Sequence, residues 1–356
     1  MATSKVSRRA LMLGAVAAVA GTAAAGCGAD DDPSGRGAPA AGSGSLEEVS
    51  VLTGVGFQGR ESPLAVGIAQ GMFAQAGLKV TVLPGKGTTE NLKLLKSGAA
   101  TFATLDVSGL IIARTKDNIT EVKLTSILHQ RNLACFMALP SSGINTPRDL
   151  AGKRITFIPG GINFVLWDTY AKLAGLPNSK VQWRQAGPTQ NGPLLAQRQV
   201  DAISQFVPGR VAVELVTKQT VNVLPFTDVM TDIHGSAIGV TDETATGKAS
   251  MVKRFNHALY QAVRYTLDNP AKAADIYLAQ PQAKTQPRPA VLGEIQSLAG
   301  YVRPIAVPGQ PTPPLGHFNA DRVARNIAIL QGAGQIPAGL IPEQIVAFDL
   351  AGDPVE

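Results

Sequence analysis

The side chains that could hold a small molecule follow predicted strands of this sequence, in loops rich in glycine and polar residues. The first loop, residues 54–62, offers an aromatic face at Phe57 and a guanidinium at Arg60. In open α/β sheets, ligands bind beyond the carboxyl ends of strands, where helix N-termini present unpaired N–H groups. We therefore expect non-covalent binding at these loops and near residue 130, by Phe57, Gln58, Arg60, Ser62, Gly85, Lys86, Gly87, Asp106, Ser108, Gln130, Asn132, Gly160, Gly161, Asn163, Gly187, Gln205 and Phe206.

Several of these residues also have a purely structural interpretation. Phe57 and Phe206 could belong to the core, because buried aromatic side chains are common there. Asp106 could cap the helix that follows it rather than contact a ligand. Lys86 and Arg131 could be solvated surface charges. Glycine-rich turns are often only turns, so both interpretations stay open.

Thiol, metal and acid–base chemistry are not indicated. Cys135 lies in an apolar run over residues 133–139, which predicts a buried and inert thiol. Cysteine and histidine show no spacing typical of metal ligands, so we expect no metal or other cofactor. His129 and His234 have no obvious carboxylate partner. Trp167, in a predicted helix, and Trp183, in a predicted strand, are better explained by packing.

The composition is that of a globular protein with little net charge. The chain has 356 residues, of which 45% are hydrophobic, and a formal charge of +6. Lys5, Arg8 and Arg9 lie in a predicted signal peptide, and their removal leaves 29 basic against 26 acidic side chains. This balance is too even to suggest nucleic-acid binding. The length suggests roughly two domains.

The N-terminus has the pattern of an export signal. Arg8 and Arg9 precede an apolar run over residues 10–25, which is shorter than the ~20 residues of a spanning helix. The run ends in AAGC, and this resembles a bacterial lipobox in which Cys27 becomes the lipidated first residue. The alternative is an ordinary signal with an incidental cysteine, because Ala24 replaces the usual leucine. We expect a signal peptide over residues 1–26 and a flexible tether over 27–45, which is rich in Gly, Ser, Pro and Ala.

From residue 46 the sequence alternates short β-type runs with helical runs. Strands are predicted at residues 49–53, 79–83, 101–105 and 122–128, with helices at 64–76, 88–97 and 107–115. The alternation restarts with strands at 154–158, 181–184, 201–204 and 221–224, and helices at 146–150, 163–173, 190–197 and 211–217. This order favours two α/β units with largely parallel sheets. Residues 249–330 are mainly helical, with helices expected from 249 to 269, at 271–278, 289–298 and 318–330, and an irregular Pro-rich loop at 303–316.

Four segments resemble one known family in the same order. These are GMFAQAGLKV at residues 71–80, SGINTPRDLAGKRI at 142–155, QVDA at 199–202, and the pairs Arg254-Phe255 and Asn269-Pro270. They are similar to motifs of the bacterial ABC-transporter solute-binding lipoproteins for nitrate, sulfonates and thiamine pyrimidine precursors, the SsuA/ThiY-like family. The resemblance covers about residues 46–278.

The resemblance implies an α/β architecture of the periplasmic-binding-protein type II fold, two lobes joined by two crossing segments with the ligand between them. Lobe 1 would comprise residues 46–131 and 235–356, and lobe 2 residues 132–234. The crossings would fall near residues 129–132 and 233–240.

The implied function is capture of a small organic solute for an ABC importer. The partners would be the ligand and the permease subunits. The protein would be a monomer that touches the membrane only through its lipid, on the outer face of the cell membrane or in the periplasm. Two alternatives stay open: an enzyme on the same fold, of the pyrimidine synthase or desulfinase type, and a lipid-anchored sensor.

The nature of the solute is less defined. The loops of the second unit hold few charges, which favours a neutral or polar planar solute, while Arg60 and Lys86 could bind one carboxylate or sulfonate. Arg60-Glu61-Ser62 stands where thiamine-precursor binders tend to have an Asn/His pair. The proline that sulfonate binders have soon after the position of Asp106 is missing.

Overall fold

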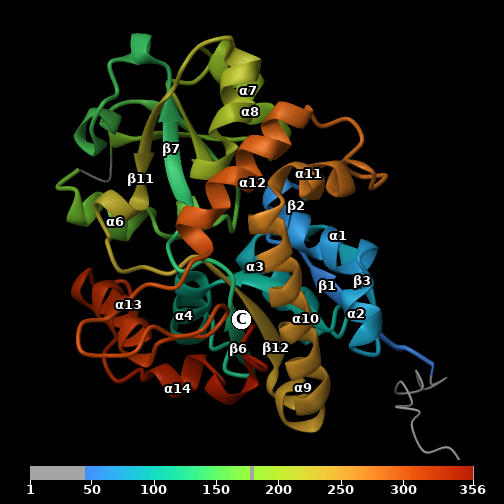
Figure 1. Cartoon of the computed structure of the whole chain (residues 1–356). Helices are drawn as coiled ribbons and strands as arrows, with labels where there is room; N and C mark the ends of the chain where they lie inside the picture. The colour runs from blue at the N-terminus through green and yellow to red at the C-terminus, as the bar shows by residue number, and fades with distance from the viewer. Residues whose placement is uncertain (1–44, 177–179, 356) are drawn as a thin grey trace, which may run out of the picture. The chain divides into compact units, whose positions relative to one another are not determined.

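Two five-stranded sheets organise the residues that the computed structural model describes, 45–176 and 180–355 (Figure 1). The first sheet has the strand order β3-β1-β5-β12-β6 and the second β11-β7-β10-β8-β9. The strands of the first are β1 (Glu47–Leu52), β3 (Leu78–Leu83), β5 (Phe102–Asp106), β6 (Val122–Ile127) and β12 (Ser236–Thr241). Those of the second are β7 (Ala134–Ala138), β8 (Arg154–Phe157), β9 (Gln182–Gln185), β10 (Ala202–Phe206) and β11 (Asn222–Pro225).

Both sheets are mixed, where the sequence suggested largely parallel ones. In the first sheet, β12 runs antiparallel to β5 and β6. In the second, β7 runs antiparallel to β10 and β11. The reason is that β7 and β12 are the strands by which the chain enters each sheet from the other one. Each therefore arrives in the opposite direction to the strands formed by local βαβ crossovers.

Helices cover both sheets. Those that precede or follow strands of the first sheet are α1 (Ser62–Ala69), α2 (Met72–Gln75), α3 (Thr88–Lys96), α4 (Val107–Lys116), α9 (Asp242–Gly247) and α10 (Ala249–Asp268). Those within the second region are α5 (Ile162–Val165), α6 (Trp167–Leu173), α7 (Pro188–Ala196) and α8 (Arg210–Thr217). The C-terminal helices are α11 (Pro270–Leu278), α12 (Arg288–Val302), α13 (Ala320–Gly332) and α14 (Pro342–Ile345).

Shorter elements complete the connections. A two-stranded ribbon pairs β2 (Val55–Gly56) with β4 (Gly85–Lys86). Single 3-10 turns are η1 (Gly59–Glu61), η2 (Pro140–Ser142), η3 (Pro147–Leu150), η5 (Val207–Gly209), η6 (Phe226–Asp228) and η7 (Phe348–Leu350).

Several predicted helices have different bounds or types in the structure. The helix expected at 64–76 is divided into α1 and α2, because Gly71 adopts a φ of 70° that ends one helix and begins the next. The helix expected at 163–173 is divided at Leu166 into α5 and α6. The helix expected at 318–330 begins at Ala320, since Asn319 is its N-cap and accepts a bond from the Arg322 amide. The turn at 147–150 is a 3-10 helix.

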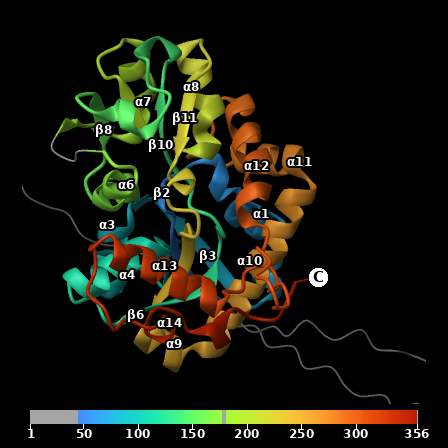
Figure 2. The same cartoon turned by 90° about the vertical axis from the view of Figure 1, so that its left-hand side faces the viewer.

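The chain passes between the two sheets twice, over residues 128–133 and 226–235. Part of the second predicted crossing, residues 236–240, therefore lies in β12. The C-terminal helix α13 contacts both crossings: Arg322 donates to Gln130 Oε1 and to the Gln130 carbonyl, each at 2.7 Å. One turn later, Asn326 Oδ1 accepts a 3.0 Å bond from the His234 amide. Figure 2 shows α13 beside α4, below the second sheet.

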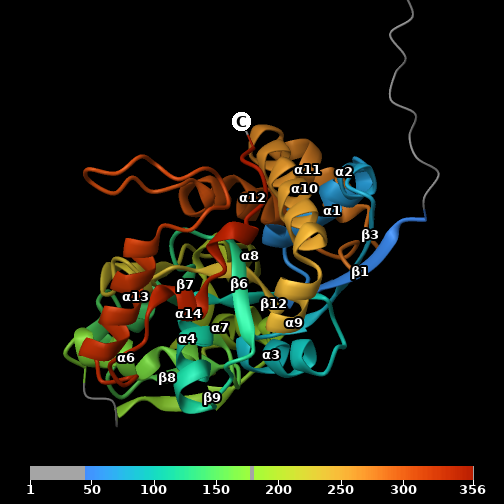
Figure 3. The same cartoon turned by 90° about the horizontal axis from the view of Figure 1, so that it is seen from below.

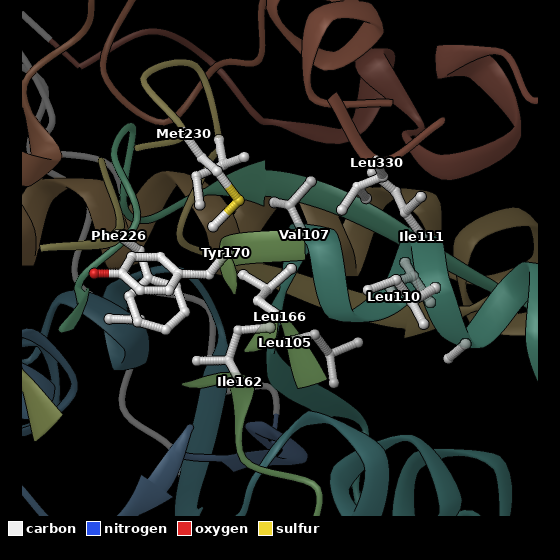
Figure 4. Close-up of a cluster of buried hydrophobic side chains, with 14 of the residues drawn as sticks. Leu105, Val107, Leu110, Ile111, Ile162, Leu166, Tyr170, Phe226, Met230 and Leu330 are labelled. Atoms are coloured by element: carbon white, nitrogen blue, oxygen red, sulfur yellow. The ribbon is translucent and has the colours of Figure 1, made fainter. Parts of the chain in front are cut away.

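A buried apolar cluster extends from the first sheet into the second region (Figure 4). It includes Leu105 and Val107 at the end of β5 and the start of α4, together with Ile162 of α5, Tyr170 of α6 and Leu166 between these helices. A second cluster packs α10 on the opposite side of the first sheet, where the Phe255 and Phe102 rings stack. Figure 3 shows α10 lying along α1. These clusters fix the loops at the ends of the strands, which form the site.

Among the described residues, no helix is both long enough and apolar enough to cross a membrane. The predicted signal peptide, Cys27 and the tether up to residue 44 lie outside the described residues.

Candidate ligand-binding cleft

Two small adjoining cavities lie between the loops of the two sheets. The first, called here the Thr88 cavity, has a volume of about 30 Å³ and is lined by Gly54, Val55, Arg60, Gly87, Thr88, Thr104, Asp106, Leu133, Ile162, Phe206 and Ser236. The second, the Asn191 cavity, has a volume of about 50 Å³ and is lined by Val55, Gln58, Arg60, Ile158, Gly161, Ile162, Asn163, Phe164, Pro188, Asn191, Ser204, Gln205 and Phe206. They share four lining residues, so they are parts of one cleft. At these volumes each has room for only a few water-sized groups.

Arg60 connects the two sides of the cleft. It lies in η1, just before α1, and only 9% of its side chain is exposed. Its guanidinium carbon is 4.6 Å from the centre of the Phe206 ring, a cation–π contact with the end of β10. Nη2 donates to the Val55 carbonyl at 3.4 Å, and Nε is 3.5 Å from Glu61 Oε1.

Two buried carboxyl groups lie beside Arg60. Glu61 Oε1 accepts a 3.4 Å bond from the Gly54 amide, and Glu294 Oε2 on α12 accepts a 3.2 Å bond from the Arg60 amide. Burial raises the pKa of both carboxyls, and the charge of Arg60 acts in the opposite direction. A Cβ at Gly59 would lie 3.0 Å from Glu294 Oε2, so this close approach depends on a glycine.

Asp106 is both a helix cap and a cavity wall. It is the N-cap of α4, and Oδ1 accepts a 3.1 Å bond from the Gly109 amide. Oδ2 accepts a 2.8 Å bond from Asn132 Nδ2. Burial raises the pKa of Asp106 to about 7, against the lowering effect of these bonds. Its backbone amide donates to Thr88 Oγ1, which places α3 next to α4 at the Thr88 cavity.

Backbone contacts close the cleft at a pair of glycines. Gly87 has a φ of 97°, and a Cβ there would lie 3.1 Å from the carbonyl oxygen of Gly160 across the cleft. A Cβ at Gly160 would lie 3.0 Å from Thr89 Cβ. The two loops thus approach as only glycines permit. On the same loop, Gly85 leaves no space at all, because a Cβ would lie 1.8 Å from the Thr53 carbonyl oxygen, while the side chain of Lys86 is exposed.

The second-sheet side of the cleft is lined by uncharged polar groups. Asn163 Nδ2 donates to the Cys135 carbonyl at 2.9 Å and to the Gln205 carbonyl at 3.0 Å. Asn191 on α7 donates from Nδ2 to the Ser204 carbonyl at 2.7 Å, and among the described residues its buried Oδ1 has no partner. This face therefore retains hydrogen-bonding capacity within a largely apolar wall.

Of the residues expected from the sequence, eight line the two cavities: Gln58, Arg60, Gly87, Asp106, Gly161, Asn163, Gln205 and Phe206. Gly160 lies beside them through its contact with Gly87. Gly85 and Lys86 form β4, next to Gly87.

The other expected residues lie outside the lining of these cavities. The Phe57 carbonyl accepts a bond from Gln286, and Ser62 is buried as the first residue of α1. Ser108 Oγ accepts from Asn326, so it belongs to the contact with α13. Gln130 accepts two hydrogen bonds from Arg322, at its side-chain Oε1 and at its backbone carbonyl. Asn132 Nδ2 donates to Asp106 Oδ2 and to the His234 carbonyl. The Gly187 amide donates to Gln190 Oε1 at the start of α7.

Sequence reasoning missed several lining residues. Thr88 and Asn191 lie in the first turn of a helix that follows a strand, so the same rule would have found them had it been extended one turn. Thr104 lies inside the buried strand β5 and shows no such signal, although its Oγ1 lacks a partner among the described residues. Ser204 is hidden in the same way in β10.

Nucleophilic and metal chemistry find no support in the described residues. Cys135 is fully buried in β7, and burial raises the pKa of its thiol well above the usual value. Burial lowers the pKa of His129 and of His234 to about 3, so both are neutral at neutral pH. The described residues include no group of three or more side chains placed to hold a metal ion.

Comparison with known proteins gives one family and a set of similar folds. Residues 60–273 match the family model described as NMT1/THI5 like. A search of curated proteins finds no match.

Among solved structures, the alkanesulfonate-binding protein SsuA from Xanthomonas axonopodis pv. citri, bound to MOPS, matches at 17% identity with a TM-score of 0.65, over 85% of this chain and 99% of that one. The periplasmic nitrate-binding protein NrtA from Synechocystis PCC 6803 matches at 13% identity with a TM-score of 0.65, over 86% and 87%. The desulfurization enzyme DSZB matches at 14% identity with a TM-score of 0.53, over 86% and 96%. These likenesses confirm the periplasmic-binding-protein fold.

Proposed function

The chain belongs to the NMT1/THI5-like family, and from this premise we propose that it captures a small organic solute between its two sheets by closure of two lobes. The solute would be pyrimidine-like, sulfonate-like or another planar compound. Lobe 1 would comprise residues 46–131 and 235–356, and lobe 2 residues 132–234.

The position of Arg60 is the observation that carries the proposal. This side chain belongs to a loop of the first sheet, yet its guanidinium covers the Phe206 ring of the second sheet, and it lines both cavities. A contact of this kind exists only while the two sides are close together. Opening at the crossings near Gln130 and Asp232 would separate Arg60 from Phe206 and give a solute access to the cleft.

The neighbours in structure support a binding role. SsuA and NrtA are described by their names as binding an alkanesulfonate and nitrate. By analogy of fold, this protein would deliver its solute to the permease subunits of an ABC importer. Cys27 would anchor it by a lipid to the outer face of the membrane, and residues 28–45 would be the tether.

An enzymatic role is less well supported. DSZB shows that the fold can hold an enzyme, and such an enzyme needs a reactive group in the cleft. Here the lining of both cavities consists of backbone, amide, hydroxyl, apolar and aromatic groups with Arg60 and Asp106. Cys135 is fully buried within β7 of the second sheet, and burial raises the pKa of its thiol. We therefore propose a binding protein.

Thermal-shift screening of the purified mature protein tests the capture of a solute. The panel contains pyrimidines, sulfonates, taurine, nitrate and aromatic acids. A ligand at a hundredfold excess over its Kd should add about 2.7 kcal/mol to the free energy of unfolding. A blank screen, with circular dichroism showing that the protein is folded, would count against the proposal.

Membrane fractionation tests the anchor. Cys27→Ala should release the exported protein into the soluble fraction, while Cys135→Ala should leave it with the membranes. Retention of Cys27→Ala at the membrane would refute the lipid anchor without affecting solute capture.

A further inference from the structure

The cation that lines the two cavities, Arg60, is not free for an anionic ligand. Arg60 and Asp106 are the charged residues among those that line the two cavities. Glu61 and Glu294 lie directly behind Arg60, at the distances given above. The guanidinium of Arg60 thus has two buried carboxyl groups beside it, and the charge of Arg60 lowers the pKa of both against the effect of burial.

The hydrogen bonds of Arg60 are also partly occupied. Nε faces Glu61, Nη2 donates to Val55, and the face of the guanidinium is covered by Phe206. Among the described residues, Nη2 donates the hydrogen bond and Nε makes the ion pair, while Nη1 has neither contact. The paired N–H groups that normally bind a carboxylate or sulfonate in a bidentate manner are therefore not both free.

The opposite face of the cleft has a hydrogen-bond acceptor that lacks a donor among the described residues. Asn191 is 2% exposed, and because its Nδ2 donates to the Ser204 carbonyl, the orientation of the amide is fixed with Oδ1 as an acceptor. This Oδ1 lacks a partner among the described residues, and Asn191 lines the cavity. A ligand with an N–H or O–H group satisfies it, whereas nitrate or a simple alkanesulfonate has no hydrogen to donate.

Resting on the proposed function, we propose that the cleft selects an uncharged, flat solute with at least one N–H donor directed at Asn191 Oδ1, and that it discriminates against anions. Phe206 and Phe164 supply aromatic surface in the same cavity for the flat part of the solute. The paired Arg60 contributes its one free nitrogen as a donor to an acceptor atom of the solute. In this respect the chain differs from the binding proteins named for alkanesulfonate and nitrate.

Matched pairs of compounds test the charge directly. The pairs are benzamide and benzoate, nicotinamide and nicotinate, and benzenesulfonamide and benzenesulfonate, each at the same millimolar concentration and ionic strength. The uncharged member of at least one pair should raise the Tm, and the anion should not exceed a sodium chloride control. A larger shift with the anions would overturn the proposal.

The outcomes separate this proposal from the proposed function. If the wider screen finds an anionic ligand, solute capture stands and the selectivity for uncharged solutes is refuted. If that ligand is uncharged and carries an N–H group, both stand. If neither the pairs nor the screen give any ligand, both fail.

A variant tests the role of Asn191. Asn191→Ala should weaken the Kd of the uncharged ligand roughly five- to one-hundredfold, because the buried donor of the ligand loses its acceptor. Gln75→Ala, which removes an exposed amide on α2, should leave this Kd unchanged. Equal affinity in Asn191→Ala and the unaltered protein would refute the assigned contact. Since the pair screen uses the unaltered protein, it decides the charge even if this variant does not fold.

Discussion

Around the cleft, the loops of the first sheet carry Arg60 and Asp106, with Glu61 behind them, whereas those of the second sheet carry Asn163 and Asn191. The charge of Arg60 is matched by Glu61, its neighbour in the sequence, and by Glu294 on α12, a helix that also contacts α8 and η5 of the second region. Arg60 and Glu61, which are adjacent in η1, would stay together whether the cleft is open or closed. The described residues that line the second side carry no charge, and their amides donate to carbonyls of β7 and β10. One acceptor, Asn191 Oδ1, has no partner among the described residues.

The charged side and the neutral side of the cleft have different roles, one in stability and the other in the choice of solute. The charged side stabilises the loops that form the mouth of the cleft, because buried ions are tolerated only when paired. The neutral side is better suited to discriminate between solutes, because an unmatched buried acceptor penalises any ligand without a donor. Variants that weaken one side should therefore affect mainly stability, and variants of the other should affect stability less and binding more.

Arg60→Gln should have the largest effect on stability. It leaves Glu61 and Glu294 buried without their cation, which costs about 3–5 kcal/mol for a broken buried pair. Their raised pKa values would rise further, so the loss should be smaller at pH 5 and grow as the pH rises and the carboxyls ionise. Urea denaturation at pH 5 and pH 8 measures it.

Arg264→Gln is the matched control, since Arg264 also pairs with one carboxylate, at 2.9 Å, but both side chains are more than half exposed. It should cost at most about 0.5 kcal/mol. If Arg60→Gln and Arg264→Gln had the same free energy of unfolding, the charged side of the cleft would not contribute more to stability than a surface ion pair.

Asp106→Asn should change the pH dependence of stability. The folded pKa of about 7 exceeds the usual 3.8, so the stability contributed by this carboxyl is present below pH 4 and is lost as the pH rises through 7. Relative to the Asn variant, the unaltered protein should lose about 4 kcal/mol between pH 4 and pH 8.

His129 and His234 have lowered pKa values, so they change stability in the opposite direction. The two histidines act in the same way in the unaltered protein and in Asp106→Asn, so their effects cancel when the free energies of unfolding of the two proteins are compared. Chemical denaturation at several pH values gives the difference in free energy of unfolding between the unaltered protein and Asp106→Asn. If this difference is constant with pH, Asp106 does not titrate in this range.

Asn163→Ala should have an intermediate effect on stability. It leaves the carbonyls of Cys135 and Gln205 without their side-chain donor, at a cost of about 1–3 kcal/mol. Asn145→Ala, at an exposed position where the side chain accepts a 2.9 Å bond from Asn222 Nδ2, should cost at most about 1 kcal/mol. The solute affinity of Asn163→Ala should also fall, and unchanged affinity would remove Asn163 from the binding face.

Phe206→Leu should have the smallest effect, about 1 kcal/mol, because it keeps apolar area and removes the cation–π contact that joins the two sides. Phe164→Leu is the control: it lines the same cavity, is 38% exposed and has no guanidinium over it. Small-angle scattering should show a more open average shape for Phe206→Leu than for Phe164→Leu. The same shape for both would mean that the Arg60 contact does not hold the sides together.

The sequence predicted the α/β fold because strand and helix periodicities are local. It failed where distant segments decide, as at β7 and β12, whose antiparallel direction follows from the passage between sheets. The division of the helix at Gly71 was also missed, because a glycine inside an apolar run does not reveal its sign of φ.

For the site, loops after strands led to Arg60, Asp106 and Phe206 because backbone topology brings strand ends together. Sequence reasoning could not tell a residue facing the cleft from one facing α13, as for Gln130 and Ser108. That distinction depends on a helix 192 and 218 residues later in the chain. Thr104 lies within an apolar strand, so the sequence did not indicate that it lines the cleft.

The place of β12 has a consequence for the folding of the chain. This strand lies between β5 and β6, yet it is made only after the whole second sheet, whose strands all fall within residues 134–225. The second sheet can therefore assemble from contiguous chain, while β5 and β6 wait for a strand more than a hundred residues away. Closing such a long loop slows folding and leaves two strand edges unpaired meanwhile. The first sheet, which holds the charged cluster, should be the last part of the protein to become native.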